Sequence, residues 1–274
     1  MRAIIDCDPV VHIVANVQWA VGNEENEEMV REHTHTFVKE VLAKCECDEF
    51  IMVVQGVGHK NYRNVILPRY KEHRKTQPAV TKWKPIIIDE LVKMGAVELK
   101  HIESDDALAI LAKKYDYEVL VVENDKDLAQ IQGRHFNPYK KESPSKPVER
   151  WYTYNKFDAM YSLCLQTITG DSTDMPNELC GMEGVGPAKA KALLDRVSQE
   201  NWLPIISGAY MAQYGISKGL SRMALTFDMV KLLTVPTKEM PETQMVYDLP
   251  FIANDLDIDT FESAESENAD NLFE

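Results

Sequence analysis

The sequence predicts an α/β protein in which helices flank a mostly parallel sheet. Four runs of strand length are rich in β-branched residues and occur at 2–6, 50–54, 96–102 and 118–122. Helical stretches separate them, at about 27–44, 86–94 and 104–115. Because strand and helix alternate, parallel strands joined by crossover helices are the simplest arrangement.

Beyond about residue 156 the pattern becomes helical. Apolar residues recur at helical spacing from Met160 to Ile168, and Gly170 is suited to end that helix. Two further helices are expected, one at 187–197 and one that runs from Ser221 as N-cap to about 233. The expected organisation is an α/β core at 1–155, a helical region at 156–236 and an acidic, disordered tail at 237–274.

The composition favours a protein that remains inside the cell. The chain has 274 residues, a formal net charge of −14 and five cysteines, which suit reduced thiols. Its apolar runs are shorter than the roughly 20 residues that span a bilayer. Acidic residues also occur too early in the N-terminal stretch for a signal peptide. We expect a cytoplasmic monomer without membrane association, in an infected bacterial host if the gene belongs to a phage.

Charge is distributed unevenly along the chain. Residues 60–84 carry eight lysines and arginines against one acid, Glu72, whereas no lysine or arginine follows Lys238. A basic stretch of this kind is either a solvated face or a surface that meets phosphate groups.

Acidic residues follow three of the expected strands. They are Asp6 and Asp8, then Glu103, Asp105 and Asp106, then Glu123, Asp125 and Asp127, joined by Asp171 and Asp174 in the loop GDSTD. Each could singly cap a helix, but the carboxyl ends of parallel strands share one edge, so together they should converge. Two carboxylates about 4 Å apart repel by roughly 4 kcal/mol, which a cation would relieve. Oxygen ligands favour Mg²⁺ or Mn²⁺, and a pair of such ions serves phosphodiester hydrolysis.

The stretch CGMEGVGPAKAKALL at 180–194 combines three glycines with a proline at the expected start of a helix. Glycine permits close backbone approach, and free amides at a helix N-terminus favour an anion such as phosphate. Glycine spacing leaves three interpretations open: a dinucleotide-binding turn, a nucleic-acid-binding hairpin and a purely structural turn.

Six segments resemble the 5′ nuclease superfamily in order and approximate spacing: IIDCDP, LPRYKEHRK, IESDDALAILAKKY, VENDKDLAQI, GDSTD and GMEGVGPAKAKALL. Over about residues 2–235 the chain is most similar to bacteriophage 5′ exonucleases and flap endonucleases and to the 5′ nuclease domain of bacterial DNA polymerase I. The resemblance implies a PIN-like core with a basic arch at about 60–90, and a helix-hairpin-helix-type DNA-binding region at 156–236. It also implies structure-specific 5′-3′ exonuclease or flap endonuclease activity on DNA or RNA primers in phage replication.

The same resemblance implies roles for single residues. Lys71 and Arg74 would be catalytic, because they would stabilise charge on the scissile phosphate. Two Mg²⁺ or Mn²⁺ ions would be held by Asp6, Glu103, Asp105, Asp106, Asp125, Asp127, Asp171 and Asp174, with Asp8 and Glu123 as auxiliaries. DNA would be bound by Tyr70, which would stack on a terminal base, and by Gly181, Gly184, Gly186, Lys189 and Lys191, with a K⁺ ion at the hairpin.

One position departs from the pattern of this superfamily. After the run at 50–54, related nucleases carry an Asp that holds the first metal, and this chain has Gly56 or Gly58 there. Three functions stay open: an active nuclease in which Asp8, His59 or water compensates, a DNA-structure-binding protein with weakened or lost catalysis, and an RNA-directed nuclease of related core fold. The expected partners are DNA with 5′ ends, flaps or RNA primers. The acidic tail either binds a single-strand-binding protein or polymerase, covers the basic arch, or only keeps the protein soluble.

Overall fold

The computed structural model describes residues 1–20, 26–58, 60–75, 77–140, 148–176 and 178–254. The strands of its sheet are β1 (Arg2–Asp6), β2 (Glu49–Gln55), β3 (Val97–Leu99), β4 (Leu120–Val122), β5 (Gly133–Phe136), β6 (Trp151–Tyr154) and β7 (Ile252–Ala253). Their order is β3-β2-β1-β4-β5-β6, and β7 pairs with β2. Strands β1 to β5 pair in parallel, whereas β6 and β7 are antiparallel, so the predicted α/β class with a mostly parallel sheet is confirmed.

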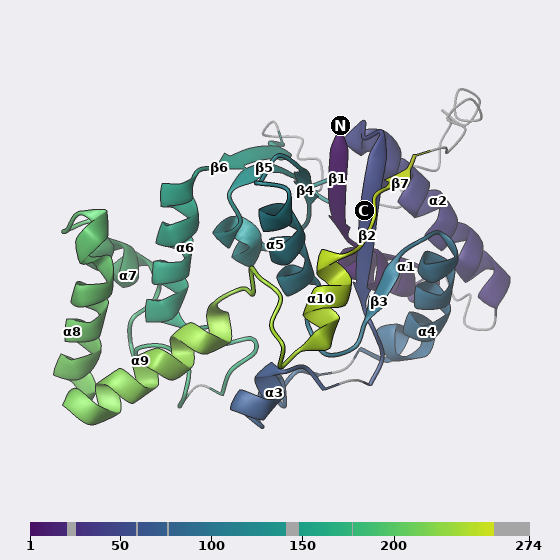
Figure 1. Ribbon diagram of the computed structural model, residues 1–274. Coiled ribbons are helices and arrows are strands. Elements are labelled where there is room, and N and C mark those ends of the chain that lie inside the picture. Colours follow the sequence, from purple (N-terminus) through teal and green to yellow (C-terminus); the bar gives the residue numbers. More distant parts are fainter. Residues whose placement is uncertain (21–25, 59, 76, 141–147, 177, 255–274) are drawn as a thin grey trace.

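Helices bury both faces of the sheet (Figure 1). Ile5 of β1 packs in a cluster with residues of α1 (Asp8–Ala20), α2 (Glu27–Cys45) and α4 (Pro78–Lys93). Ile4 faces the opposite way and packs with α5 (Ser104–Lys114) and α10 (Pro241–Tyr247). Because neighbouring side chains of β1 enter different cores, the strand reads as a continuous apolar run, as expected for a central parallel strand.

The remaining helices lie beside the sheet, on the left of Figure 1. They are α6 (Lys156–Thr169), α7 (Pro187–Leu194), α8 (Trp202–Tyr214) and α9 (Ile216–Val230), with the short 3₁₀ helix η2 (Gln199–Asn201). They have a separate apolar core, in which Ile168, Leu194 and Ile206 are buried. Two short elements complete the described helices, α3 (Arg63–Ile66) before α4 and the 3₁₀ helix η1 (Lys126–Gln130) after β4. No helix among the described residues is both long and apolar enough to cross a bilayer.

Helix α4 corrects the extent of the expected arch. The helix begins at Pro78 rather than near residue 86, and it packs against α1 and α2. Its residues Trp83, Ile87 and Leu91 are buried. Residues 78–90, which were expected to belong to a basic arch, therefore form most of a core helix, because their apolar side chains recur at helical spacing.

The start of α9 was also misplaced. Ser221 lies inside this helix, and Gly215 with φ of 81° precedes its first residue. A glycine that adopts positive φ separates α8 from α9, so no serine cap is needed at 221.

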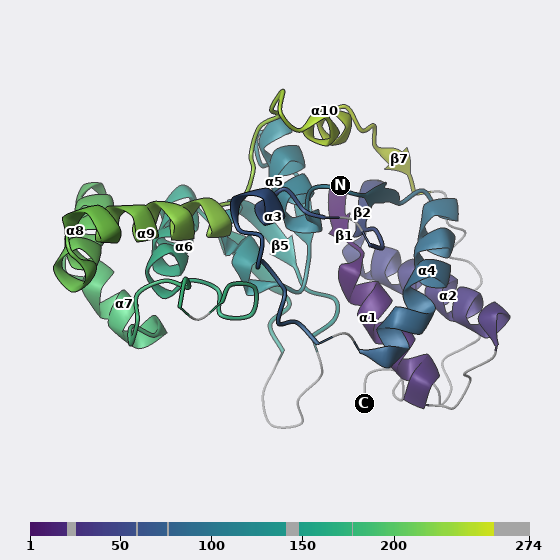
Figure 2. The ribbon, with the colours of Figure 1, turned by 90° about the horizontal axis from the view of Figure 1, so that it is seen from below.

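The expectation of a disordered tail from residue 237 is wrong for residues 237–254. Helix α10 packs on α5, and β7 extends the sheet by pairing with β2 (Figure 2). The apolar side chain of Val246 is fully buried against α5, which outweighs the acidic composition of this segment. Residues 255–274, the rest of the expected tail, lie outside the described residues.

Candidate active site

The carboxyl ends of the central strands open onto one cleft with a volume of about 590 Å³. Both expected catalytic cations, Lys71 and Arg74, line it. The expected metal ligands that line the same cleft are Asp6, Glu103, Asp105, Asp125, Asp127, Asp171 and Asp174. Of the expected ligand set, only Asp106 does not reach this cleft. Acids from four distant segments of the chain thus meet at the carboxyl edge of the sheet, as the strand-end rule predicts.

Asp6 and Asp105 form the centre of the acidic group. Asp6 ends β1 and is 4% exposed, and its Oδ1 accepts a hydrogen bond from the Asp8 amide at 2.9 Å. Burial raises the pKa of Asp6 well above its ordinary value, and the charges of Asp8 and Asp125 raise it further. Burial likewise raises the pKa of Asp105, with added repulsion from Asp6 and Asp125. These carboxylates repel one another, so a cation placed among them would lower the free energy of the site.

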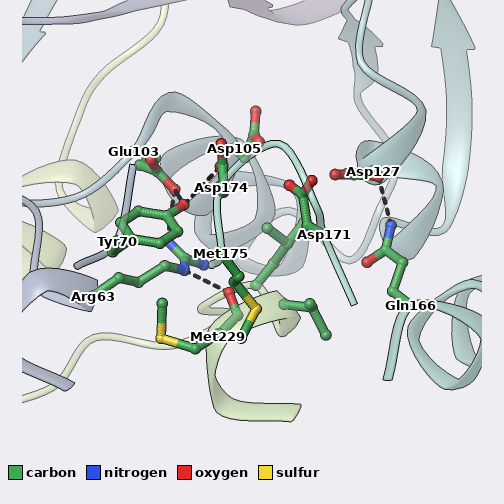
Figure 3. A pocket seen from close by; sticks show the side chains of 12 residues that line it. Arg63, Tyr70, Glu103, Asp105, Asp127, Gln166, Asp171, Asp174, Met175 and Met229 are labelled. Atoms are coloured by element: carbon green, nitrogen blue, oxygen red, sulfur yellow. Dashed lines mark hydrogen bonds and ion pairs between the residues drawn. The ribbon is translucent and has the colours of Figure 1, made fainter. Parts of the chain in front are cut away.

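A second group of acids lies on the loops next to η1 and α6. The Asp125 carboxylate accepts the Asp127 amide at 2.8 Å, and Asp127 accepts the Gln166 side chain at 2.8 Å (Figure 3). Burial raises the pKa of Asp127, and the charges of Asp125 and Asp171 contribute to the rise. The Asp171 side chain accepts the Thr173 amide at 2.8 Å, which fixes the loop that follows α6. These hydrogen bonds leave carboxylate oxygens directed at the cleft.

Glu103 and Asp174 are held by cations instead. Lys71 forms ion pairs with both, at 3.4 Å to Asp174, and Arg74 pairs with Asp174. Burial would raise the pKa of Glu103, but the charges of Lys71 and Arg63 outweigh it and lower that pKa. Burial keeps the pKa of Asp174 above its ordinary value despite Lys71 and Arg74. The cleft therefore has acidic residues at its centre and a neutralised rim at Lys71 and Arg74.

Two expected site residues, Asp106 and Tyr70, are buried and hydrogen-bonded inside the protein. Asp106 is fully buried and accepts two hydrogen bonds from the Arg63 guanidinium, at 2.6 and 3.0 Å. It also accepts the Leu233 amide at 2.9 Å, so its oxygens are already engaged and it is not placed to hold a metal. Tyr70 was expected to stack on a base, but it is only 6% exposed, and its hydroxyl lies 2.9 Å from both Glu103 and Asp174. A buried ring that orients two carboxylates cannot stack on DNA in this conformation.

Sequence reasoning missed Arg63 and Lys84. Arg63 is 2% exposed, and its Nη1 donates to Glu103 at 2.9 Å as well as to Asp106. It stood among eight basic residues with nothing to mark it as the buried one. Lys84 lines the cleft from α4, where burial lowers its pKa. Lys84 directly follows the buried Trp83 and precedes the buried Ile87 by three residues. This helical spacing could have placed it at the edge of the buried face.

The donor set fits a hard divalent cation, since it consists of carboxylate oxygens with unrelieved repulsion. Among the residues that the structure describes, however, no three Asp, Glu, His or Cys side chains close around a single point. The charges of Asp6 and Asp125 raise the pKa of Asp105, and cations hold Glu103 and Asp174 at the rim. Ligation would therefore require the carboxylates to draw together, which the charge of an ion favours.

The two glycines at the position that lacks an acid have different surroundings. Gly56 lines the cleft and donates its amide to Leu99 O at 2.8 Å, and a Cβ built on it would lie 2.8 Å from that same oxygen. Gly58 has φ of 73° and open space around it. Asp8 is already bound, because its carboxylate accepts the Gln55 amide at 2.9 Å and the Ser104 hydroxyl at 3.1 Å. His59 lies outside the described residues.

The glycine hairpin separates into a packed end and an open end. A Cβ on Gly181 would lie 2.3 Å from the carbonyl carbon of Thr169, so this glycine is required for packing against the end of α6. A Cβ on Gly184 or Gly186 would meet no atom within 4 Å. Gly186 precedes α7 without a side-chain cap. Lys189 is exposed and donates to Gly184 O at 2.8 Å, and Lys191 is exposed beside Asp195. The open end presents amides and lysines to solvent, and loop rather than strand precedes Gly181, which disfavours the dinucleotide turn.

A carboxylate-lined cleft at the edge of a parallel sheet, bordered by lysine and arginine, is the arrangement that a phosphodiester hydrolase requires. The family model of the 5′-3′ exonuclease N-terminal resolvase-like domain matches residues 18–161. The chain therefore belongs to the 5′-3′ exonuclease family of nucleases.

Individual relatives agree with this membership. The 5′-3′ exonuclease of Aquifex aeolicus is 27% identical over 218 residues, which cover 74% of this chain and 72% of the relative. The flap endonuclease Xni of Aliivibrio fischeri is 23% identical over 205 residues, 67% of this chain and 73% of the relative. The resemblance and the enzyme class expected from the motifs are confirmed.

The fold is similar to solved nucleases of bacteriophage T5. A T5 5′-exonuclease with bound divalent zinc ions superposes with a TM-score of 0.61 at 15% identity, covering 85% of this chain and 90% of that one. A T5 flap endonuclease in complex with DNA and metal ions gives a TM-score of 0.52 at 12% identity, covering 91% of this chain and 100% of that one. These superpositions establish the shared fold.

Proposed function

We propose that this chain is a divalent-metal-dependent, structure-specific 5′-3′ exonuclease or flap endonuclease that hydrolyses phosphodiesters in DNA or RNA primers. The observation that carries the proposal is the convergence of carboxylates from β1, α5, η1 and the loop after α6 on a cleft that Lys71 and Arg74 also line. The metal ions and DNA bound by the T5 neighbours support it.

The residues of the cleft divide into two roles. Asp6, Asp105, Asp125, Asp127 and Asp171 would hold one or two Mg²⁺ or Mn²⁺ ions, with Glu103 and Asp174 completing the ligand set at the rim. Such ions supply an activated water and neutralise charge on the reacting phosphate. Lys71 and Arg74 would exchange part of their contact with Glu103 and Asp174 for the phosphate oxygens, and thereby orient the phosphodiester.

The helical region at 156–236 would bind the duplex next to the cut. Gly184 and Gly186 offer open backbone at the start of α7, and Lys189 and Lys191 add charge. A K⁺ ion held by the hairpin backbone near Gly184 and Gly186 would supply further positive charge for the DNA phosphates. We place the enzyme as a monomer in the cytoplasm of a phage-infected host, where it acts in replication. A single-strand-binding protein or polymerase is the proposed partner of residues 255–274.

A second function is favoured by one observation. No acidic residue follows β2 at 56–62, and a Cβ at Gly56 would meet the Leu99 backbone oxygen at 2.8 Å. Substitution by Asp there therefore demands backbone movement. A chain that cannot hold the first metal would bind DNA structures and cut them slowly or not at all.

Cleavage of a 5′-labelled flap substrate in Mg²⁺ or Mn²⁺ decides between these functions. We expect metal-dependent product from the wild type, no product from Asp125→Asn, and unchanged DNA affinity in that variant. The matched control is Asp116→Asn, an exposed acid just beyond the far end of α5, which should cut normally. Lys189→Ala should instead weaken binding and reduce its salt dependence while the cleavage rate of bound DNA is kept. Full DNA binding with no wild-type product in either metal would establish the binding-protein alternative.

A further inference from the structure

The C-terminal segment at 237–254 runs from the helical region back to the sheet and passes over α5 (Figure 2). Within it the Glu242 carboxylate accepts three successive backbone amides. Its Oε1 accepts Lys100 N at 2.7 Å, and its Oε2 accepts His101 N at 2.7 Å and Ile102 N at 2.9 Å. One acid thus satisfies the backbone donors of a whole bend.

This bend leads directly into the cleft. Residues 100–102 connect the end of β3 to Glu103, which precedes α5, and Asp105 lies in the first turn of that helix. The bend is held from its other side too, because His101 O accepts the Tyr62 amide at 2.9 Å. Arg63, the residue after Tyr62, binds Glu103 and Asp106. Displacement of the bend would therefore move Glu103 and Asp105 together.

Glu242 is itself fixed in place. It occupies the first turn of α10 behind Pro241, where the helix dipole favours a carboxylate. Next to it the Thr243 hydroxyl accepts the Thr237 amide at 2.8 Å and donates to Met240 O at 2.6 Å. Val246, one turn further on, is fully buried against α5. The acceptor is thus held by a packed helix whose first turn is bonded to Thr237 and Met240.

We propose that Glu242 is a positioning residue, which fixes the backbone at 100–102 and thereby places Glu103 and Asp105 for metal and substrate. This inference rests on the proposed nuclease function, since it assigns the C-terminal segment a task in building the same site. Glu242 acts on these residues through the backbone, and a misplacement of about 1 Å at a reacting group can cost about 100-fold in rate.

The test compares Glu242→Ala with Glu239→Ala in the full chain. Glu239 is an exposed acid of the same segment, and within the described part of the chain no hydrogen bond or ion pair involves its side chain. We expect Glu242→Ala to lower kcat about 10-fold or more and to raise the Mn²⁺ concentration for half-maximal cleavage, with KM for the flap substrate within about twofold. Hydrogen exchange of the Lys100, His101 and Ile102 amides should accelerate, because they lose their acceptor. Glu239→Ala should match the wild type in every measurement.

The milder variant Glu242→Gln tests the inference even if Glu242→Ala does not fold. It keeps one acceptor oxygen and replaces the other by an NH₂ group that cannot accept, so an intermediate kcat and partial loss of protection are expected. Normal kcat in both variants, unchanged exchange at 100–102, or an equal effect of Glu239→Ala would overturn the inference. An inactive wild type with accelerated exchange in Glu242→Ala would instead refute the nuclease function and leave the positioning contact established.

Discussion

Asp105 and Asp106 are neighbours in the chain and have opposite electrostatic surroundings. Asp105 lines the cleft, where burial and the charges of Asp6 and Asp125 raise its pKa. Asp106 is fully buried one residue further on, and Arg63 supplies two hydrogen bonds to it. Asp105 is thus unfavourable for folding and available to a cation, whereas Asp106 maintains the fold.

Asn at each position should separate these roles. Because the folded pKa of Asp105 is raised, the native state holds its proton more tightly than the unfolded state, and metal-free stability falls as pH rises above about 4. Asp105→Asn should therefore abolish cleavage and raise metal-free stability at pH 7.5, because the cost of ionising a buried carboxyl is removed. Asp106→Asn should lower stability by about 3–5 kcal/mol, because the buried Arg63 then keeps only Glu103 as a charge partner.

Urea denaturation with and without Mn²⁺ checks this pair. Mn²⁺ should stabilise the wild type more than Asp105→Asn, since the ion binds the native cleft. A loss of stability of similar size in both variants would contradict the assignment of Asp105 to the cleft chemistry.

Among the elements, the glycine hairpin shows best that one motif can serve packing and binding together. Gly181 has φ of 53°, and its Cβ position is filled by the backbone of Thr169 and Gly170. Gly186 has φ of −84° and open space, at the N-cap of α7. The motif predicted a tight turn. The structure shows in addition that its glycines form one end that is packed and one end that faces solvent.

Alanine substitutions should divide the hairpin in the same way. Gly181→Ala places a methyl group against backbone that cannot yield, so we expect a loss of about 3 kcal/mol or more in the free energy of unfolding. Gly186→Ala should cost no more than about 1 kcal/mol, yet weaken DNA binding where a methyl group obstructs the open backbone. Equal effects on stability, or unimpaired DNA binding by Gly186→Ala, would contradict this division. Denaturation and DNA titration provide both readouts.

The elements that the sequence predicted well are those with a strong local pattern. The runs ending at Asp6 and Val122 are strands, and the acids after them reach one cleft because parallel strands end at one edge. Contacts between residues far apart in the chain could not be predicted from the sequence. Arg63 binds Asp106 over 43 positions and Glu242 reaches Lys100 over 142, and no periodicity marks either partner. Tyr70 was misread for the same reason, since its burial depends on Asp174, far along the chain.

At the scale of the whole molecule, the acidic charge of the C-terminal part is shared between a folded segment and its continuation. Residues 237–254 bind α5 and β2, with Tyr115 and Phe251 packed at a centroid distance of 4.9 Å. Residues 255–274 contain eight acids and no lysine or arginine. A like-charged segment of this kind repels the phosphates of a nucleic acid substrate at long range.

Two truncations should distinguish the folded segment from its continuation. A chain ending at Asn254 keeps α10 and β7, so its stability should change by no more than about 0.5 kcal/mol, and its DNA affinity should rise at low salt as the repulsion is removed. A chain ending at Lys238 loses Val246 and Phe251 from the core and Glu242 from the bend at 100–102, so several kcal/mol of stability and the cleavage activity should be lost. Denaturation and DNA titration at about 0.05 and 0.2 M salt measure both effects. Weaker DNA binding by the chain ending at Asn254 would show that residues 255–274 assist the substrate rather than repel it, because removing like charge alone cannot lower the affinity.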